Sequence, residues 1–438
     1  MFNSITDTKR MKCTVDELVK AGRLNVVART EESLYDRIKN IGITISEYRE
    51  ISEYVTAVGI TDEFRKVIET VKPEEGITPA GFRHEFVFGG ADRSLRIDLN
   101  RDIAFAENGL RRPGNILFSA NTADPSEVRT MKDLIANLTT NPQIIYSNFL
   151  NNPKVNKNNQ FKDRFEVLAE LKELVGPGVD ISVELNNPFA DEAEIMEEVA
   201  RFEEILTKYQ LVVKVPHTGP LNRNNVDAFL EGSYTAYDKG ESKDFFYGHN
   251  LAYKLQKLGY RVNFTLMAEP HQTALALLAR PYFINAFVER RKTQTLSLQT
   301  LIDNLDRTED YIYEEEIHDF MLKSDMLAAE DEDIDAAVAK ARKLIEYRNG
   351  QGTGYDGLDS VRHSLRILKR ANLPDARLIV CNMKSPEMYT DLDKLAVEPE
   401  FADMKQRMVV TCEPSYFSQF TSSPTVYCYQ RSFLSSIR

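Results

Sequence analysis

From about residue 115 onward, short β-rich apolar runs alternate with segments of helical periodicity. Such alternation is typical of βα units with a parallel sheet, and eight runs suggest a closed (β/α)8 barrel. A doubly wound open sheet is the alternative, but its first βα turn would usually carry a glycine-rich motif, and NTADPSEV has none. The eight runs are NILFSANTA, a segment ending in NLTTNPQII, VDISVELNN, YQLVVKVPHT, YRVNFTLMAE, YFINAFVER, ARLIVCNMK and MVVTCEPSY.

Amphipathic helices are predicted between several of these runs, for example over 190–209 and 334–347. Their apolar residues recur with a helical period, so one side of each helix can cover the sheet.

The first 110 residues have a different pattern, and we expect a mainly helical extension there. Thr14 and Glu17 have capping-box spacing, and Thr30, Ser46 and Thr61 each precede acidic residues and an apolar-periodic run. The runs FRHEFVF and SLRIDL flank the turn-like GGADR and could form a β-hairpin. We therefore divide the chain into an extension over 1–110 and a barrel over 111–438.

The composition and charge of the chain argue against several classes of function. The chain has 438 residues, 42% of them hydrophobic, which is enough for a large core. Its formal charge of -12 argues against a general nucleic-acid-binding surface, because phosphate contacts need clustered cations. The four cysteines form no zinc-type cluster, and no apolar stretch reaches the ~20 residues of a membrane span. We expect a soluble cytoplasmic protein without a metal site or membrane partner.

Polar residues interrupt nearly every predicted strand near its end. In a parallel barrel, catalytic groups project from the C-terminal ends of the strands, so these residues should meet at one rim. Each of them alone could be a capping residue, a turn residue or a member of a surface ion pair. Their convergence on one rim favours a functional site there. The polar residues are Asn121, Asn141, Glu184, Lys214, Asn263, Thr265, Asn285, Arg290, Asn382 and Lys384.

Lys214, in the buried-looking run LVVKVP, has the most specific chemistry. Burial lowers the pKa of an ammonium, and a neutral amine can attack a ketone to form an imine. Glu184 on the preceding strand could move protons for that step, or it could simply form a salt bridge with Lys214. Arg290 and Lys384 could hold the phosphate of a sugar phosphate, with Asn285 and Asn382 as further donors.

The motifs ANTADPSEV, NLTTNPQII, ISVEL, VVKVPHT, VNFTL and INAFVER occur in this order. In this respect the chain resembles the transaldolase family, including its shorter relatives, the fructose-6-phosphate aldolases. The resemblance spans about 116–292 and continues more loosely to about 415. It implies a (β/α)8 barrel, sugar-phosphate substrates, a lysine Schiff base, no metal or organic cofactor, and a role in the pentose phosphate pathway.

The resemblance also implies roles for individual residues. The Schiff-base lysine falls on Lys214, and the carboxylate that works through a water falls on Glu184. The implied site has the catalytic residues Lys214, Glu184, Asn121 and Thr265, and the substrate-binding residues Asn141, Asn263, Asn285, Phe287, Arg290, Asn382 and Lys384.

Two positions depart from the family pattern. The family has an Asp, which handles a substrate hydroxyl proton, where this chain has Asn121, and asparagine cannot act as a general base. The candidates to replace it are Asp124, His217 and Glu269, and the sequence favours none of them. The second departure is Asn285, where transaldolases usually have Ser.

Phe287 favours a transaldolase over an aldolase, since the small aldolases of the family have Tyr there. Two alternatives stay open: an aldolase of the same fold, and a catalytically impaired barrel that only binds sugar phosphates. The sequence also leaves open whether the chain forms a homo-oligomer.

Overall fold

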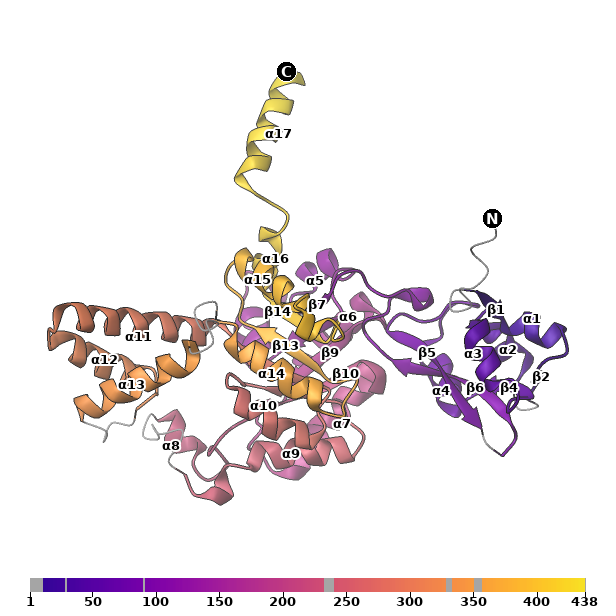
Figure 1. The fold of residues 1–438 in the computed structure, drawn as a ribbon, viewed down its shortest axis with the longest axis horizontal. Helices are drawn as coiled ribbons and strands as arrows, with labels where there is room; N and C mark the ends of the chain where they lie inside the picture. Colours follow the sequence, from indigo (N-terminus) through magenta and orange to yellow (C-terminus); the bar gives the residue numbers. More distant parts are fainter. Residues whose placement is uncertain are drawn as a thin grey trace. The chain divides into compact units, whose positions relative to one another are not determined.

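The computed structural model describes residues 11–27, 30–89, 91–231, 240–327, 333–349 and 357–437. The chain divides into two compact units (Figure 1). One unit contains Met1–Pro113 with Gly176–Val179, and the other contains Gly114–Val175 with Asp180–Arg438.

The N-terminal unit contains more β-structure than the sequence pattern indicated. Strands β5 (Phe82–Gly89) and β6 (Ser94–Arg101) pair antiparallel, as expected for the predicted β-hairpin. Strands β4 (Ala57–Ile60) and β2 (Asn25–Val26) extend this hairpin to a four-stranded sheet in the order β2-β4-β6-β5. A separate antiparallel pair joins β1 (Lys12–Thr14) and β3 (Gly42–Thr44), and the helices are α1 (Val15–Lys20), α2 (Glu32–Ile38), α3 (Ile45–Ile51) and α4 (Asp62–Val71).

Two of the four predicted helix caps form. The Thr14 hydroxyl accepts a 3.2 Å hydrogen bond from the Glu17 amide, and Thr61 caps α4 in the same way. The third helix is capped by Thr44 instead of Ser46, because the chain leaves β3 at Thr44 in an extended conformation and turns helical at Ile45. Thr30 does not cap α2, whose N-cap is Glu31.

The C-terminal unit is the predicted barrel, closed in the order β10-β11-β12-β13-β14-β7-β8-β9 with every neighbouring pair parallel. All eight apolar runs of the sequence are its strands, which confirms the (β/α)8 fold class. The strands are β7 (Ile116–Asn121), β8 (Asn137–Thr140), β9 (Asp180–Glu184), β10 (Leu211–Pro216), β11 (Val262–Thr265), β12 (Phe283–Phe287), β13 (Arg377–Cys381) and β14 (Met408–Cys412).

Helices surround the strands, and a core of buried aliphatic and aromatic side chains lies between the two layers. The helix predicted over 190–209 is α7 (Glu192–Gln210), which buries Val199 and Phe202 in this core. The other helices are α5 (Pro125–Met131), the π-helix η2 (Gln143–Leu150), α6 (Arg164–Val175), α8 (Val226–Leu230), α9 (Tyr247–Lys257), α10 (Pro270–Ala276), α14 (Asp359–Arg370), α15 (Pro386–Ala396), α16 (Pro414–Gln419) and α17 (Pro424–Ile437).

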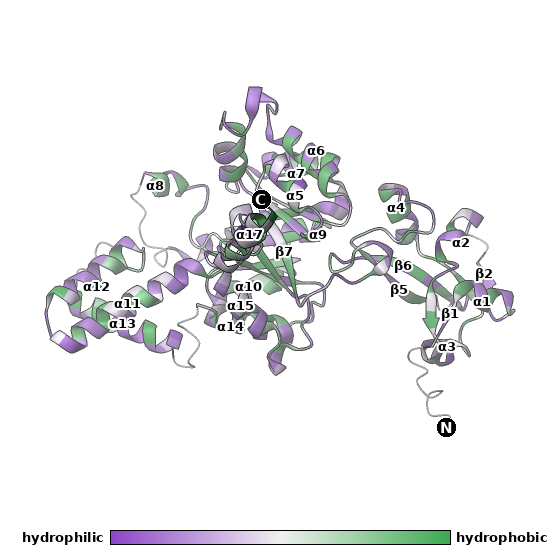
Figure 2. Cartoon of the chain, turned by 90° about the horizontal axis from the view of Figure 1, so that it is seen from above, coloured by the Kyte–Doolittle hydropathy of each residue, from purple (hydrophilic) through white to green (hydrophobic). Residues whose placement is uncertain are grey.

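Three further helices are inserted between β12 and α14, namely α11 (Glu289–Thr308), α12 (Ile312–Lys323) and α13 (Ile334–Asn349). They lie alongside one another and share a separate apolar core that includes Leu298, Met321 and Ala341 (Figure 1). Figure 2 shows hydrophobic and hydrophilic residues alternating along all three, as expected of helices that each bury one side.

Candidate active site

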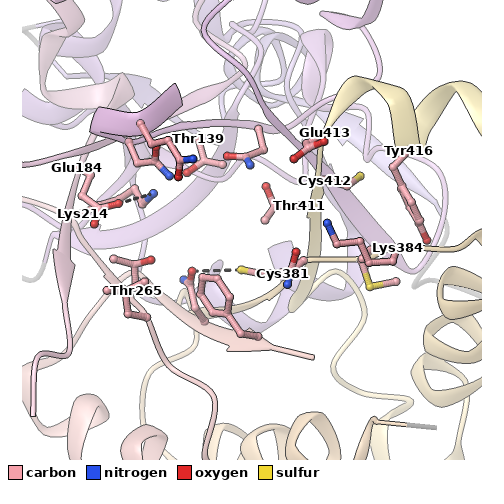
Figure 3. Close-up of a pocket in the computed structure, with 18 of the residues that line it drawn as sticks. Thr139, Glu184, Lys214, Thr265, Cys381, Lys384, Thr411, Cys412, Glu413 and Tyr416 are labelled. Atoms are coloured by element: carbon pink, nitrogen blue, oxygen red, sulfur yellow. Dashed lines mark hydrogen bonds and ion pairs between the residues drawn. The ribbon is translucent and has the colours of Figure 1, made fainter. Parts of the chain in front are cut away.

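A cavity of about 460 Å³ lies at the C-terminal ends of the barrel strands (Figure 3). This volume is within the range typical of small-molecule sites. Nine of the eleven site residues predicted from the sequence line the cavity: Asn121, Asn141, Glu184, Lys214, Thr265, Asn285, Phe287, Asn382 and Lys384.

Lys214 is only 5% exposed, and all six residues of its strand β10 are buried. Two groups compensate its ammonium for the loss of water. Its Nζ lies 3.0 Å from Glu184 Oε2, and it donates a 2.9 Å hydrogen bond to the Thr140 carbonyl on β8. Glu184 is positioned for this contact because β9 and β10 pair in a register that sets Glu184 directly beside Lys214.

The Lys214–Glu184 pair has the geometry for proton transfer. An ammonium has no lone pair, so Lys214 must lose a proton before its nitrogen can attack a carbonyl. At 3.0 Å, Glu184 is within reach to accept that proton directly, and it could return it through a water when the added carbonyl oxygen leaves. The salt bridge expected as an alternative role for Glu184 is therefore present, and its geometry is also compatible with proton transfer.

A belt of hydrogen-bonded side chains runs around the inside of the barrel and joins seven of the eight strands. The strand that contributes no link is β10, which carries Lys214. A polar layer replaces the branched apolar residues that usually fill such barrels, and the links hold its members in place. The links are Cys381 to Asn285 (3.2 Å), Asn285 to Asn263 (2.6 Å), Asn263 to Ser182 (3.4 Å), Ser182 to Asn137 (3.0 Å), Asn137 to Ser119 (2.7 Å) and Thr411 to Ser119 (2.9 Å).

The belt explains the position of Asn263, which is 1% exposed and lies outside the cavity. Its amide supports Asn285, which does line the cavity. Burial raises the pKa of Cys381 to about 12, so its sulfur stays protonated and donates to the Asn285 oxygen. The orientation of the Asn285 amide is therefore determined from two sides.

Arg290 lies outside the cavity, in contrast to its predicted role beside a substrate phosphate. It is at the start of α11, its side chain is 67% exposed, and its guanidinium is 3.4 Å from Asp325. The next residue, Arg291, turns inward and is 2% exposed. A helix turns about 100° per residue, so two consecutive arginines cannot point the same way. Of the two predicted phosphate cations, the structure brings only Lys384 to the cavity.

Three residues were candidates to replace the acid or base missing at Asn121, and each of them makes contacts elsewhere in the structure. Asp124 caps α5 by accepting a 2.8 Å hydrogen bond from the Ser126 amide. Glu269 pairs with two buried arginines, Arg291 and Arg348. His217 packs edge-on against Phe264, outside the cavity.

Several cavity residues were not predicted from the sequence. Glu413 follows β14 directly, so the rule applied to the other strands, that polar residues at strand ends mark the site, would have found it. Nothing in the local sequence distinguishes the others from ordinary strand or helix residues; they include Thr139, Cys381, Thr411, Cys412 and Tyr416.

Stability should fall in mild acid because of His217. Burial first, and then the neighbouring His249 and His271, lower the pKa of His217 from 6.5 to about 4. The unfolded chain therefore binds this proton below pH 6.5 while the folded chain does not, so stability is full above that pH and is lost as the pH falls towards 4. We expect a loss of about 2 kcal/mol at pH 5 from this group.

The measurement is urea unfolding at pH 7 and pH 5 for the wild type and for His217→Gln. The variant should lose about 2 kcal/mol less than the wild type between the two pH values. The control is His363→Gln on α14, since His363 is not one of the groups that lower the pKa of His217, and it should keep the wild-type difference. An equal loss in wild type and His217→Gln would contradict the prediction.

Among the described residues, no group of three or more His, Cys, Asp or Glu side chains is arranged to hold a metal ion. Within the same part of the chain, no helix is both long and apolar enough to span a membrane.

A closed parallel barrel with a buried lysine–glutamate pair at the C-terminal ends of its strands defines an enzyme-like site for carbonyl chemistry. The family model described as transaldolase/fructose-6-phosphate aldolase matches residues 118–347, more than half of the chain, so the protein belongs to this family. It is therefore an enzyme of the aldolase and transaldolase class. A comparison with curated proteins gives no match.

Proposed function

We propose that the protein is a transaldolase. In this proposal, Lys214 forms an imine with a ketose phosphate, the C3–C4 bond breaks, and the dihydroxyacetone unit passes to an aldose phosphate. The observation that carries the proposal is the Lys214 amine, buried in a cavity of about 460 Å³ with Glu184 3.0 Å away. The protonated imine would accept the electron pair of the breaking carbon–carbon bond.

The cavity offers donors for both ends of such a substrate. Near Lys214, the side chains of Asn141 and Thr265 are available for sugar hydroxyls. Lys384 lies across the cavity from Lys214, where it could bind the phosphate (Figure 3). Asn382 adopts a left-handed backbone conformation with φ of 62°, which asparagine tolerates, at the turn between β13 and Lys384.

Phe287 supports transfer over release of free dihydroxyacetone. It lines the cavity and has no group that can donate a proton. After cleavage, the three-carbon unit remains on Lys214 as an enamine, and its release as free ketone requires a proton on carbon. A cavity without a phenol at this position favours capture of the unit by an aldehyde.

Borohydride trapping tests the proposal. With fructose 6-phosphate present, we expect borohydride to reduce the imine and to leave a stable adduct on Lys214, located by peptide mass mapping. A second measurement follows product formation, which should require erythrose 4-phosphate as acceptor. Product released without an acceptor beyond one equivalent per enzyme would indicate an aldolase. The absence of any adduct on Lys214 would refute the imine mechanism and favour a barrel that only binds its ligand.

A further inference from the structure

We propose that Glu413 is the acid/base that moves the substrate hydroxyl proton when the carbon–carbon bond breaks and forms. This inference rests on the proposed function, because it assigns a residue to the cleavage step that follows imine formation. Asn121 stands where the family has its acid/base Asp, and an amide cannot act as a general base, so another residue must fill this role.

The strand register sets Glu413 beside Asn121. Cys412 on β14 is paired with Ala120 on β7, so Glu413 and Asn121 are the next residues along two parallel neighbouring strands. Both residues line the main cavity, and both also line a smaller cavity that adjoins it. A carboxylate at Glu413 therefore occupies the rim position next to the one where an acid/base is missing.

The other carboxylates that could serve are already engaged. Among the described residues that line the cavity, only Glu184 and Glu413 carry carboxylates. Glu184 is bound to the Lys214 ammonium, on the side of the cavity opposite Glu413 (Figure 3). Asp124 caps a helix and Glu269 pairs with two arginines.

The position of Glu413 across the cavity suits the distal bond. A ketose bound to Lys214 through C2 extends away from the lysine, so its C4 hydroxyl lies farther from Lys214 than the imine carbon does. Glu413 would accept the proton of this hydroxyl. The oxygen then forms the aldehyde carbonyl as the C3–C4 bond breaks, and the electron pair of that bond moves into the protonated imine to give an enamine.

Transfer would use the same group in reverse. The enamine carbon attacks the aldehyde of the acceptor, and protonated Glu413 donates its proton to the new alkoxide. One carboxyl group thus returns to its starting state after each complete exchange, with no other co-reactant.

The mass of the borohydride adduct tests this role. Wild-type enzyme given fructose 6-phosphate should yield the three-carbon dihydroxyacetone adduct on Lys214, because cleavage follows imine formation. Glu413→Gln should accumulate the six-carbon adduct instead, and its release of glyceraldehyde 3-phosphate should be about 100- to 10,000-fold slower. Glutamine has nearly the same shape, and Glu413 is exposed, so the fold should tolerate the change.

Two further variants complete the test. Glu289→Gln removes a carboxylate that also follows a barrel strand closely but lies outside the cavity, and it should behave as the wild type. The double variant Glu413→Gln with Asn121→Asp places a carboxylate at the neighbouring rim position. It should cleave at least tenfold faster than Glu413→Gln alone, which corresponds to about 1.4 kcal/mol of activation free energy.

The outcomes separate this inference from the function on which it rests. No adduct of any mass on wild-type Lys214 would refute the imine mechanism itself. A trapped wild type together with Glu413→Gln that cleaves within threefold of it would overturn only the role of Glu413. Loss of both cleavage and the six-carbon adduct in Glu413→Gln would show a structural role and would also overturn the assignment.

Discussion

Replacing Lys214 with methionine should abolish activity, with a fall in kcat of at least about 10,000-fold. Methionine fills a similar volume but has no nucleophilic nitrogen, so neither the imine nor its electron sink can form. The Lys214 ammonium is compensated by Glu184 and the Thr140 carbonyl, and both partners can survive its removal. Glu184 is 14% exposed and can bind water, and the backbone carbonyl stays in the sheet.

The measurement is transaldolase turnover combined with borohydride trapping on the folded variant. We expect no adduct anywhere on Lys214→Met, even at saturating fructose 6-phosphate. The control is Lys394→Met on α15, whose side chain is 73% exposed, and it should keep both turnover and the adduct on Lys214. Residual turnover within tenfold of the wild type would show that the chemistry does not pass through this lysine.

Replacing Arg291 with methionine should strongly lower the free energy of unfolding. Arg291 is 2% exposed and donates two hydrogen bonds, of 3.2 and 2.6 Å, to the carboxylate of Asp359, which is only 4% exposed. It also pairs with Glu269, which in turn contacts Arg348 on α13. Methionine would leave Asp359 buried without its counter-ion, and breaking such a pair costs about 3–5 kcal/mol.

Urea unfolding of the wild type and Arg291→Met measures this loss, and Arg290→Met provides a closely matched control. Arg290 is the neighbouring residue, but its side chain is 67% exposed and its partner Asp325 is 70% exposed. Removing such a surface pair should change the free energy of unfolding by no more than about 1 kcal/mol. If the two variants were equally stable, the buried cluster would contribute little to the fold.

Arg290 and Arg291 show a difference that the sequence pattern cannot predict. In INAFVERR, Arg290 and Arg291 are adjacent and chemically identical. The first helical turn of α11 directs Arg290 to solvent and Arg291 into the protein, and no local feature of the sequence distinguishes the two. The prediction of a phosphate-binding cation at this point therefore selected a residue that lies outside the cavity.

Asn263 and Asn285 illustrate the same limit in a different form. Both are polar residues within apolar strands, and both were predicted to bind substrate. The barrel places Asn263 in the hydrogen-bonded belt, where it supports Asn285, and leaves Asn285 at the cavity. Depth along the barrel axis depends on strand register, which is set by pairing between strands far apart in the sequence.

The sequence by itself determined the fold class, the eight strands and nine of the eleven predicted cavity residues, because alternating apolar runs and polar strand ends are local patterns. Only the tertiary structure decided which polar groups meet. Closing the barrel brings Cys412 beside Ala120, and so sets Glu413 next to Asn121 across nearly 300 residues of chain. Pairing between the first and last strands of a barrel has no signature within either strand.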